Sequence, residues 1–454
     1  MSVNPRAPLL AISVWLALAL TASGGAPSFA PRVDVPLGPD GCRLGDCSSA
    51  PQSVALVDLD GNGSLDAVTA NALSDDVTIL LNDGAGALTV FGTLSALGAN
   101  GVAAADFDED GNADLAVAQI NSDAPESTVG IYAGNGDGTF ASPLQVAVGL
   151  FPEEIVIADF DADGHMDFAT QNLFDDSLTV RLGNGDGTFA SARTIDLGGG
   201  PSGIAVGNFD GGPVDLAVTL EEPFPGEVVI LLGDGSGGFD IQSPNLQVGD
   251  TPLSVATGDL DGDGVEDLAV PNWAEDTVSV LFGNGDGSFE PGPVLDSGLF
   301  PEDVTIADLD GDLAADIVTL DSFGSDTADG LLVVHPGNGD GTFADIELYE
   351  VGSSPSVVEV ADLNGDGALD VLTAHFDSDD LGVLLNAAAA VACVGDCDGD
   401  GSVSIAELIR GVNIALGQQP VGNCPEFDRN DDGKVSISEL VAAVNNALSG
   451  CPNS

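Results

Sequence analysis

The acidic residues of this 454-residue chain are concentrated in a short motif that recurs along the sequence. One copy, residues 259–267, reads Asp-Leu-Asp-Gly-Asp-Gly-Val-Glu-Asp and places carboxylates at motif positions 1, 3, 5 and 9. If the backbone curls around a common centre, these side chains point towards it and repel one another strongly. A hard divalent cation with oxygen ligands relieves that repulsion, and Ca²⁺ tolerates such a loop better than Mg²⁺, which prefers rigid octahedral geometry. The motif therefore predicts calcium binding.

Six copies keep oxygen-bearing side chains at all four positions. The predicted ligands are Asp58, Asp60, Asn62 and Asp66; Asp106, Asp108, Asp110 and Asp114; Asp159, Asp161, Asp163 and Asp167; Asp259, Asp261, Asp263 and Asp267; Asp308, Asp310, Asp312 and Asp316; Asp362, Asn364, Asp366 and Asp370. A seventh copy, residues 208–215, starts with Asn208, has Gly212 at the third ligand position and lacks one residue before Asp215. We predict that this copy binds no metal. The alternative, that Asp and Gly only form turns, does not explain six copies with one spacing.

The motif starts lie roughly 48 to 54 residues apart, a period typical of propeller blades. Short β-branched runs flank each motif, which indicates about four strands per repeat and hence one blade. The seventh repeat ends at residues 382–386 without a fourth strand, whereas residues 29–38 resemble residues 140–149 of the second repeat. The sequence therefore predicts a mainly β fold, a seven-bladed β-propeller over residues 29–386 that an N-terminal strand closes.

A second recurrent motif, Gly-Asn-Gly-Asp-Gly-Thr-Phe at residues 134–140, contains Asn-Gly and Asp-Gly pairs that favour hairpin turns. Its aromatic residue recurs as Phe140, Phe189, Phe239, Phe289 and Phe343. We interpret this motif as a turn that ends in a blade-packing side chain.

The repeats resemble the FG-GAP/VCBS family, the calcium-bearing propeller blades also found in integrin α-subunits. The resemblance covers residues 29–386 and implies that the side chains at positions 1, 3, 5 and 9, with a backbone carbonyl at position 7, bind Ca²⁺. It implies six calcium sites in the propeller.

A different pattern follows the Ala-rich segment 387–392, which we interpret as a linker. Residues 396–407 and 428–439 match the twelve-residue EF-hand loop, with ligands at positions 1, 3, 5, 7 and 12 and Gly at position 6. The predicted ligands are Asp396, Asp398, Asp400, Ser402 and Glu407, and Asp428, Asn430, Asp432, Lys434 and Glu439, where Ser402 and Lys434 contribute backbone carbonyls. Each loop leads into an amphipathic helix, over residues 405–416 and 437–448. We expect two further calcium ions here, about eight in all.

Residues 393–454 resemble dockerins, which duplicate a loop–helix unit without entering helices and dock onto cohesins. The resemblance implies a cohesin-like partner. Two departures weaken that implication: Glu replaces Asp at position 12, and Ile405-Ala406 and Ile437-Ser438 stand where dockerins carry a Ser/Thr pair. Cys393, Cys397, Cys424 and Cys451 fit two disulfides that would stabilise so small a module, with their pairing left open.

The charge balance excludes one class of partner. There are 74 Asp and Glu against 8 Lys and Arg, a formal charge of −66, and nucleic-acid binding needs basic residues. Residues 1–22 have the basic start, apolar run and small residues of a signal peptide, and no later stretch is long and apolar enough to span a membrane. We therefore predict a secreted or cell-surface protein, with a local disulfide between Cys42 and Cys47.

No catalytic motif is evident. The three histidines, His165, His335 and His375, do not occur in a Ser-His-Asp or Cys-His pattern, and the carboxylates are assigned to calcium. We predict that the protein is not an enzyme but an extracellular binding, adhesion or scaffold protein whose propeller face takes a protein or glycan ligand. Dockerin-type attachment in polysaccharide degradation is the alternative. Trp273, the only Trp beyond the signal segment, is a thin platform for a sugar.

Overall fold

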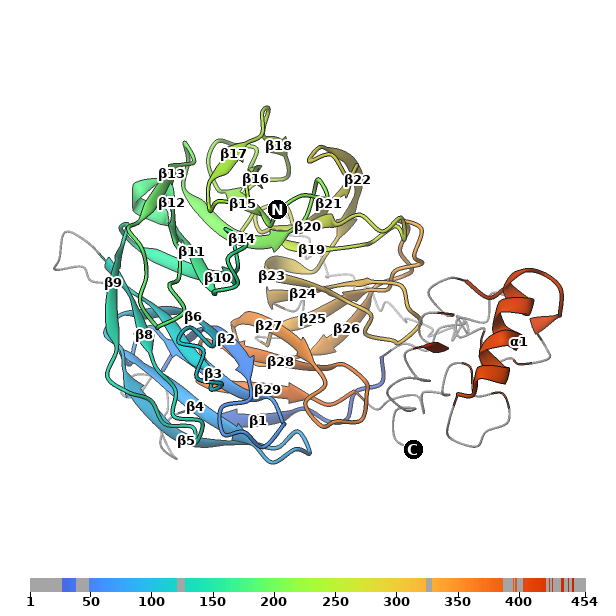
Figure 1. Cartoon of the computed structure of the whole chain (residues 1–454), viewed down its shortest axis with the longest axis horizontal. Coiled ribbons are helices and arrows are strands. Elements are labelled where there is room, and N and C mark those ends of the chain that lie inside the picture. Colours follow the sequence, from blue (N-terminus) through green and yellow to red (C-terminus); the bar gives the residue numbers. More distant parts are fainter. Residues whose placement is uncertain are drawn as a thin grey trace, which may run out of the picture.

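The computed structural model describes residues 27–37, 49–120, 127–323 and 329–386, and part of residues 395–444. Within them, seven antiparallel sheets stand radially around a central hollow, as blades of a propeller (Figure 1). The mainly β, seven-bladed fold is thereby confirmed. The predicted signal peptide, Cys42 and Cys47, and the linker lie outside the described residues.

Blades 1 to 3 contain β2 (Pro51–Val57), β3 (Asp66–Asn71), β4 (Asp76–Asn82) and β5 (Leu88–Ser95); β6 (Ala99–Ala105), β7 (Asp114–Gln119), β8 (Ser127–Tyr132) and β9 (Leu144–Val148); β10 (Pro152–Ala158), β11 (Asp167–Asn172), β12 (Ser177–Arg181) and β13 (Arg193–Asp196), with a 3₁₀ turn at Leu173–Asp175. Blades 4 and 5 contain β14 (Pro201–Gly207), β15 (Asp215–Leu220), β16 (Glu227–Gly233), β17 (Phe239–Ile241) and β18 (Leu246–Gln247); β19 (Ala256–Gly258), β20 (Asp267–Asn272), β21 (Thr277–Gly283) and β22 (Phe289–Asp296). Blades 6 and 7 contain β23 (Leu299–Ala307), β24 (Asp316–Phe323), β25 (Leu331–His335) and β26 (Glu347–Glu350); β27 (Pro355–Ala361), β28 (Asp370–His375), β29 (Asp380–Leu384) and β1 (Val33–Pro36).

The second strand of each blade is the most deeply buried. In β3, β7, β11, β15, β20 and β28 every residue is buried, because neighbouring blades pack against both faces. Small and β-branched side chains suit this position, and each core cluster joins two adjacent blades. The outer strand β5, by contrast, is largely exposed.

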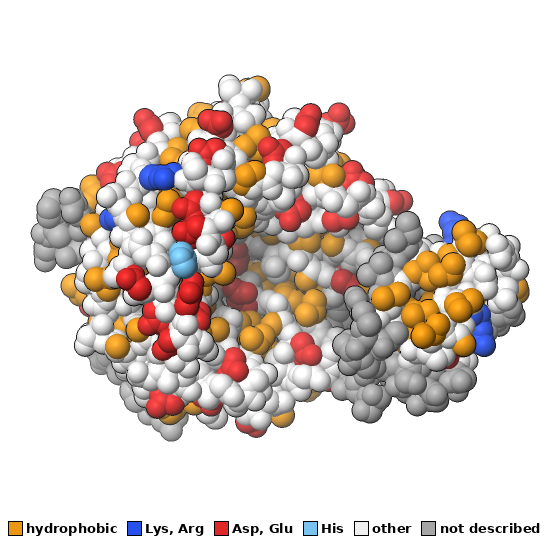
Figure 2. All heavy atoms as spheres, in the orientation of Figure 1, with side chains coloured by type: hydrophobic (Ala, Val, Ile, Leu, Met, Phe, Trp, Pro, Cys, Tyr) orange, Lys and Arg blue, Asp and Glu red, His pale blue; other side chains and the backbone are white. Residues whose placement is uncertain are grey.

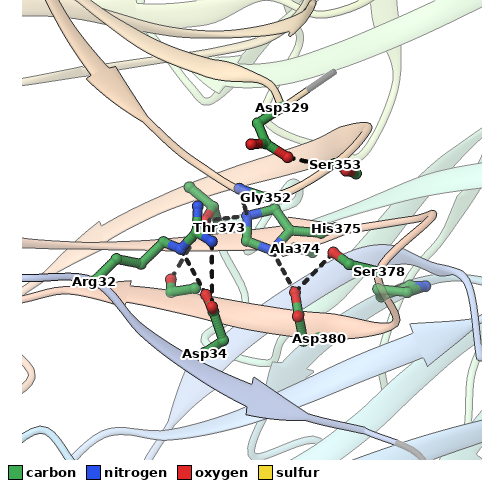
Figure 3. A network of polar contacts seen from close by, with 12 residues as sticks. Arg32, Asp34, Asp329, Gly352, Ser353, Thr373, Ala374, His375, Ser378 and Asp380 are labelled. Carbon is green, nitrogen blue, oxygen red and sulfur yellow. Dashed lines mark hydrogen bonds and ion pairs between the residues drawn. The ribbon is translucent and has the colours of Figure 1, made fainter. Parts of the chain in front are cut away.

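The N-terminal strand closes the ring as predicted. β1 pairs antiparallel with β29, with Val33 opposite Val383 and Val35 opposite Leu381. At this seam His375 lies buried at the end of β28, and its Nδ1 is 2.6 Å from Asp380 of β29, while Arg32 pairs with Asp34 (Figure 3). Residues from both ends of the propeller sequence therefore complete blade 7, which leaves no unpaired edge at the junction.

Antiparallel order divides the loops between two faces. The Asp motifs (strand 1 to 2) and the Gly-Asn-Gly-Asp-Gly hairpins (strand 3 to 4) lie at one face, which we name the motif face. The loops from strand 2 to 3 and from each blade to the next lie at the other, which we name the open face.

The hairpins link adjacent blades, as the sequence predicted for their aromatic residues. The Gly138 N–H donates to the Leu59 carbonyl of the preceding Asp motif at 3.0 Å, and Gly187 reaches Phe107 in the same way. The Phe189 ring packs edge-to-face on Phe107 at 5.4 Å. In blades 1 and 7, Asn82 and Asn386 stand where the other blades have a glycine, and their side-chain amides donate to the Leu363 and Leu309 carbonyls of the preceding blade. Each Asp motif is thus joined to the next blade.

The described part of the C-terminal region contains α1 (Ile405–Ala415), in agreement with the helix predicted from residue 405. Ser404 and Glu407 form a reciprocal capping box at its start. A disulfide joins Cys397 to Cys424, which resolves one of the pairings left open. Phe427, Cys424 and Ile414 are buried together in a small core.

Candidate functional site

The structure brings together the predicted ligands of several Asp motifs. Carboxylate oxygens at positions 1, 3 and 9 lie within 4.8 Å of one another in the first three motifs, and those at positions 1, 3 and 5 do so in the fifth. These sets are Asp58, Asp60 and Asp66; Asp106, Asp108 and Asp114; Asp159, Asp161 and Asp167; and Asp259, Asp261 and Asp263. The spacing in sequence does become a cluster in space.

Backbone geometry explains the curl of the motif. In the first copy, the carboxylate of Asp58 accepts N–H groups from Gly61 and Gly63, each at 2.9 Å. Both glycines have positive φ, a conformation that costs glycine little. The sixth copy places Leu313 at the second of these positions with φ +76°. Its N–H still reaches Asp308 at 2.9 Å, so this copy keeps the fold at the expense of strain.

Position 5 has a local role in every intact copy. Its side-chain oxygen accepts the N–H of position 7, as Asn62 does from Ser64 at 2.7 Å and Asp163 from His165 at 2.9 Å. This contact stiffens the turn that leads to position 9. The same contact occurs in motifs six and seven, where Asp312 and Asp366 accept from Ala314 and Ala368.

Position 9 is fully buried in all seven copies, the damaged one included. Its two oxygens accept backbone N–H groups from position 2 and from the end of the third strand. Asp66 does so from Leu59 and Asn82, both at 2.8 Å. We name this pair of backbone hydrogen bonds to the position-9 carboxylate the latch. Because each carboxylate oxygen offers two lone pairs, the latch leaves acceptor capacity for a cation. The sequence suggested only a ligand here, and the structure adds a structural role.

The damaged fourth motif retains the latch and replaces the rest. Asp215 accepts from Phe209 at 2.7 Å and from Gly233 at 2.8 Å. The Asn208 side-chain amide donates to the Gly212 carbonyl at 3.1 Å. An internal hydrogen bond therefore crosses the loop where other copies place facing carboxylates, and the absence of metal from this copy stays a prediction.

The intact motifs fit a divalent cation. Burial raises the pKa of Asp167 to about 6 and that of Asp316 to about 7. Backbone hydrogen bonds oppose this rise, and the charges at positions 1 and 3 add to it. The Oδ1 atom of Asp161 is buried without a hydrogen-bond partner. A calcium ion would satisfy such an oxygen and offset the repulsion. The fit rests on a donor set of oxygens alone, which is typical of calcium rather than zinc.

Of the predicted EF-hand ligands, the structure describes Glu407 and Lys434. Glu407 is almost fully buried; its Oε1 accepts the Cys397 N–H at 2.7 Å and its Oε2 accepts the Ser404 N–H at 2.8 Å. A position-12 carboxylate is thus held against the loop start. The remaining ligands, Asp396, Asp398, Asp400, Ser402, Asp428, Asn430, Asp432 and Glu439, lie outside the described residues.

A group of acidic residues in the central channel was not predicted from the sequence. The first strands of the blades enclose a cavity of about 720 Å³ that Glu153, Glu154, Glu302, Asp303 and Glu359 line. Figure 2 shows acidic side chains inside this hollow. The sequence does carry a signal for them: at the start of the first strand most repeats have small or hydroxyl residues, whereas repeats three and six have paired acids.

Aromatic side chains on the open face were also missed. Phe174 is 67% exposed and stacks on Phe151 at 4.5 Å between ring centroids. Trp273 lies on Phe300 at 4.8 Å, so it is not isolated as the sequence suggested. Each pair joins a strand 2-to-3 loop with the start of the next blade, Phe151 just before β10 and Phe300 at the start of β23, and the partners are too far apart in sequence to be recognised as a pair.

One polar relay resembles a catalytic arrangement. His375 contacts Asp380 through Nδ1 and Thr373 through Nε2, the latter at 2.8 Å (Figure 3), a contact that the sequence did not reveal. However, the Gly352 N–H also donates to Nε2 at 2.9 Å, and both His375 and Thr373 are fully buried. A substrate has no access, so we interpret the group, with nearby Asp34, as a seam of blade 7 rather than a metal or catalytic site.

Comparison with known families agrees with the fold. Residues 58–117 and 212–270 match the FG-GAP-like repeat family. These two segments of the propeller are FG-GAP-like. Each matched segment begins within one motif and ends in the strand after the next, which is one blade-to-blade step of the propeller. No curated protein sequence matches the chain.

The described residues contain no helix long and apolar enough to cross a membrane.

Proposed function

We propose that this chain is an exported, calcium-stabilised propeller that binds an extracellular protein or glycan through its open face. The observation that carries this proposal is the apolar surface of that face. Leu73, Phe174 and Phe224 project from strand 2-to-3 loops of three blades and are between 61% and 67% exposed, and Leu97 is exposed in a loop between blades. Large exposed apolar side chains on several loops of one face favour an interaction site on that face.

Calcium has a supporting role in this proposal. The Asp motifs lie on the motif face, away from the aromatic pairs, and hydrogen bonds link them to neighbouring blades. Bound Ca²⁺ would neutralise the facing carboxylates and hold these loops closed, so that metal binding and folding are coupled. A rigid ring then presents the open-face loops in fixed positions, which lowers the ordering cost of binding.

The experiment compares ligand capture by the mature chain and by a Leu73→Ser, Phe174→Ser double variant on glycan arrays and extracellular protein panels. We expect the variant to lose binding while it retains its calcium content, measured by native mass spectrometry, and its melting temperature. A ligand that the variant captures equally well would place recognition elsewhere. Fewer than three bound calcium ions would remove the calcium part of the proposal.

A second candidate is dockerin-type attachment through the C-terminal module. The observation in its favour is an apolar stripe on α1: Ile405, Ile409, Val412 and Leu416 follow helical spacing and are exposed. An Ile409→Asp variant of the full chain would abolish capture of a cohesin-like partner while glycan or protein capture by the open face is unchanged. Unchanged attachment would exclude this surface.

A further inference from the structure

The acidic residues of the channel come from opposite sides of the ring. Glu153 and Glu154 belong to β10 of blade 3, whereas Asp303 belongs to β23 of blade 6 and Glu359 to β27 of blade 7. In a ring of seven blades these strands face one another across the axis. The charges of Asp303 and Glu359 both raise the pKa of Glu154, after the larger effect of burial, to about 8. The carboxyl groups are therefore close enough to interact.

A β-bulge directs consecutive side chains into the channel. The register of β10 shifts between Pro152 and Ile155, and that of β23 shifts between Pro301 and Asp303. Bulges of this kind re-aim side chains, which explains how Glu153 and Glu154, neighbours in sequence, both line the cavity.

A purely structural role does not account for these acids. Glu154 accepts the Ile204 N–H at 3.1 Å, and Asp303 accepts the Val358 N–H at 2.9 Å and the Ser254 hydroxyl at 2.7 Å. Blade 1 makes the equivalent link with serine, because the Val102 N–H donates to the Ser53 hydroxyl at 3.1 Å. Facing carboxylates do the same task at a much higher electrostatic cost, so they indicate a second role.

A buried amide provides an independent indication. Gln171 of β11 lines the same cavity and is fully buried, and neither amide atom has a partner within hydrogen-bond distance. Gln171 lies near enough to Glu153 to lower the pKa of that carboxyl, against the larger effects of burial and of the Glu221 charge. The equivalent residue in the other blades is Ala, Thr, Pro or Leu. Only blade 3 therefore has a side-chain amide at this position, and an amide offers both a donor and an acceptor to a ligand.

The lining chemistry selects the ligand. No Lys, Arg or His occurs among the described residues that line the channel, so the carboxylates have no internal counter-charge. The cavity is far larger than one ion and within the range of small-molecule sites. The Trp273 side chain hydrogen-bonds Glu302 and so lowers the pKa of that carboxyl against the larger effect of burial.

We propose that the channel, entered from the open face, binds a small organic cation with two or more ammonium groups, a di- or polyamine. One ammonium group would lie between Glu154 and the Asp303–Glu359 pair, and Gln171 would contribute a further hydrogen bond. A divalent metal ion fits less well, because the carboxylates stand on opposite walls instead of curling around one centre. This site goes beyond the protein or glycan binding proposed above and uses different residues.

The test is calorimetric titration of the mature full-length chain with spermidine, in saturating calcium and physiological salt, so that the Asp motifs do not compete. We expect one site whose affinity falls at least about tenfold in Glu154→Gln and in Glu359→Gln. Gln171→Leu, which introduces the residue of blade 6, should weaken it less. Glu290→Gln, an exposed acid on β22, is the matched control and should bind as wild type does.

Equal affinity in the channel variants and the control would overturn the proposal, because it would show only attraction to a highly acidic protein. Binding of fully acetylated spermidine with equal affinity would overturn it as well. A third outcome would also overturn the proposal: Mg²⁺ or Zn²⁺, titrated alone, binds through Glu154 and spermidine does not bind. Circular dichroism checks that each variant is folded. None of these failures alters the protein or glycan capture by Leu73 and Phe174, so the two proposals fail separately.

Discussion

The position-9 aspartate has a structural role, the latch, and a predicted role as a calcium ligand. Two adjacent blades allow these roles to be tested separately. Asp215 in the damaged fourth motif and Asp267 in the intact fifth motif make the same latch, each with two backbone N–H groups at 2.7 to 2.8 Å. Only the fifth motif retains carboxylates at positions 1, 3 and 5. Asp215→Ala therefore removes the latch alone, whereas Asp267→Ala removes the latch and a predicted calcium ligand.

The latch gives the expected magnitude. Truncation leaves two buried N–H groups unsatisfied, at about 1–3 kcal/mol each. The lost carboxyl group returns part of that cost, because burial raises the pKa of both aspartates and so disfavours their charge. We expect a net loss of about 2–4 kcal/mol for either variant in chelator. In calcium, Asp267→Ala should lose about 3 kcal/mol more, the linkage free energy of one site at about a hundredfold excess over its Kd.

The assay is urea unfolding followed by Trp273 fluorescence, in calcium and in chelator, for wild type and both variants. The informative quantity is the difference between the calcium dependence of Asp267→Ala and that of Asp215→Ala. An Asp215→Ala variant as stable as wild type in chelator would refute the latch. Equal calcium dependence of the two variants would refute the assignment of position 9 as a ligand, or show that the fourth motif binds metal.

Three further predictions concern other residues. Leu313→Gly should stabilise the propeller by about 0.5–1 kcal/mol, because φ at this position is +76°; urea unfolding measures this, and a loss of stability would contradict it. Burial and the charge of Asp303 raise the folded-state pKa of Glu359 to about 8, so the folded state binds more protons than the unfolded state and stability falls as pH rises from about 4.5 to 8. Glu359→Gln should remove that loss, on the order of 4–5 kcal/mol for a pKa raised from about 4.5 to about 8, and a melting profile as steep as wild type over this range would count against it. His375→Ala should cost about 3 kcal/mol, because it leaves the buried Gly352 N–H without an acceptor and leaves Asp380 only the Ser378 hydroxyl as a partner. An unchanged melting temperature would show that the blade 7 seam is not needed.

The fold followed closely from the sequence because repetition amplifies weak local signals. A single short apolar run does not distinguish strand from buried helix, but seven copies at one period do. The closing strand was also predictable, because residues 29–38 carry the pattern of a fourth strand that the last repeat lacks. β1 then pairs with β29 at the expected place.

The candidate sites were only partly predictable. The Asp motifs are local, so nine consecutive residues contain their geometry, whereas the latch depends on an N–H from the end of the third strand, such as that of Asn82. The channel acids and the aromatic pairs depend on which blades face one another. That information arises only when the ring closes, and single-sequence spacing does not contain it.

The channel nonetheless left a trace in the sequence as a departure from the repeat. In an array whose blades pack alike, a residue that serves only packing should resemble its equivalents in the other blades. Ser53 and Ser254 show what packing requires at this position, and Glu154 and Asp303 exceed it. Gln171, in the same blade as Glu154, also differs from its equivalents in the other blades. Because blades 3, 6 and 7 bear these departures and face one another, the departures from the repeat indicate a site, just as the repeat itself indicates the fold.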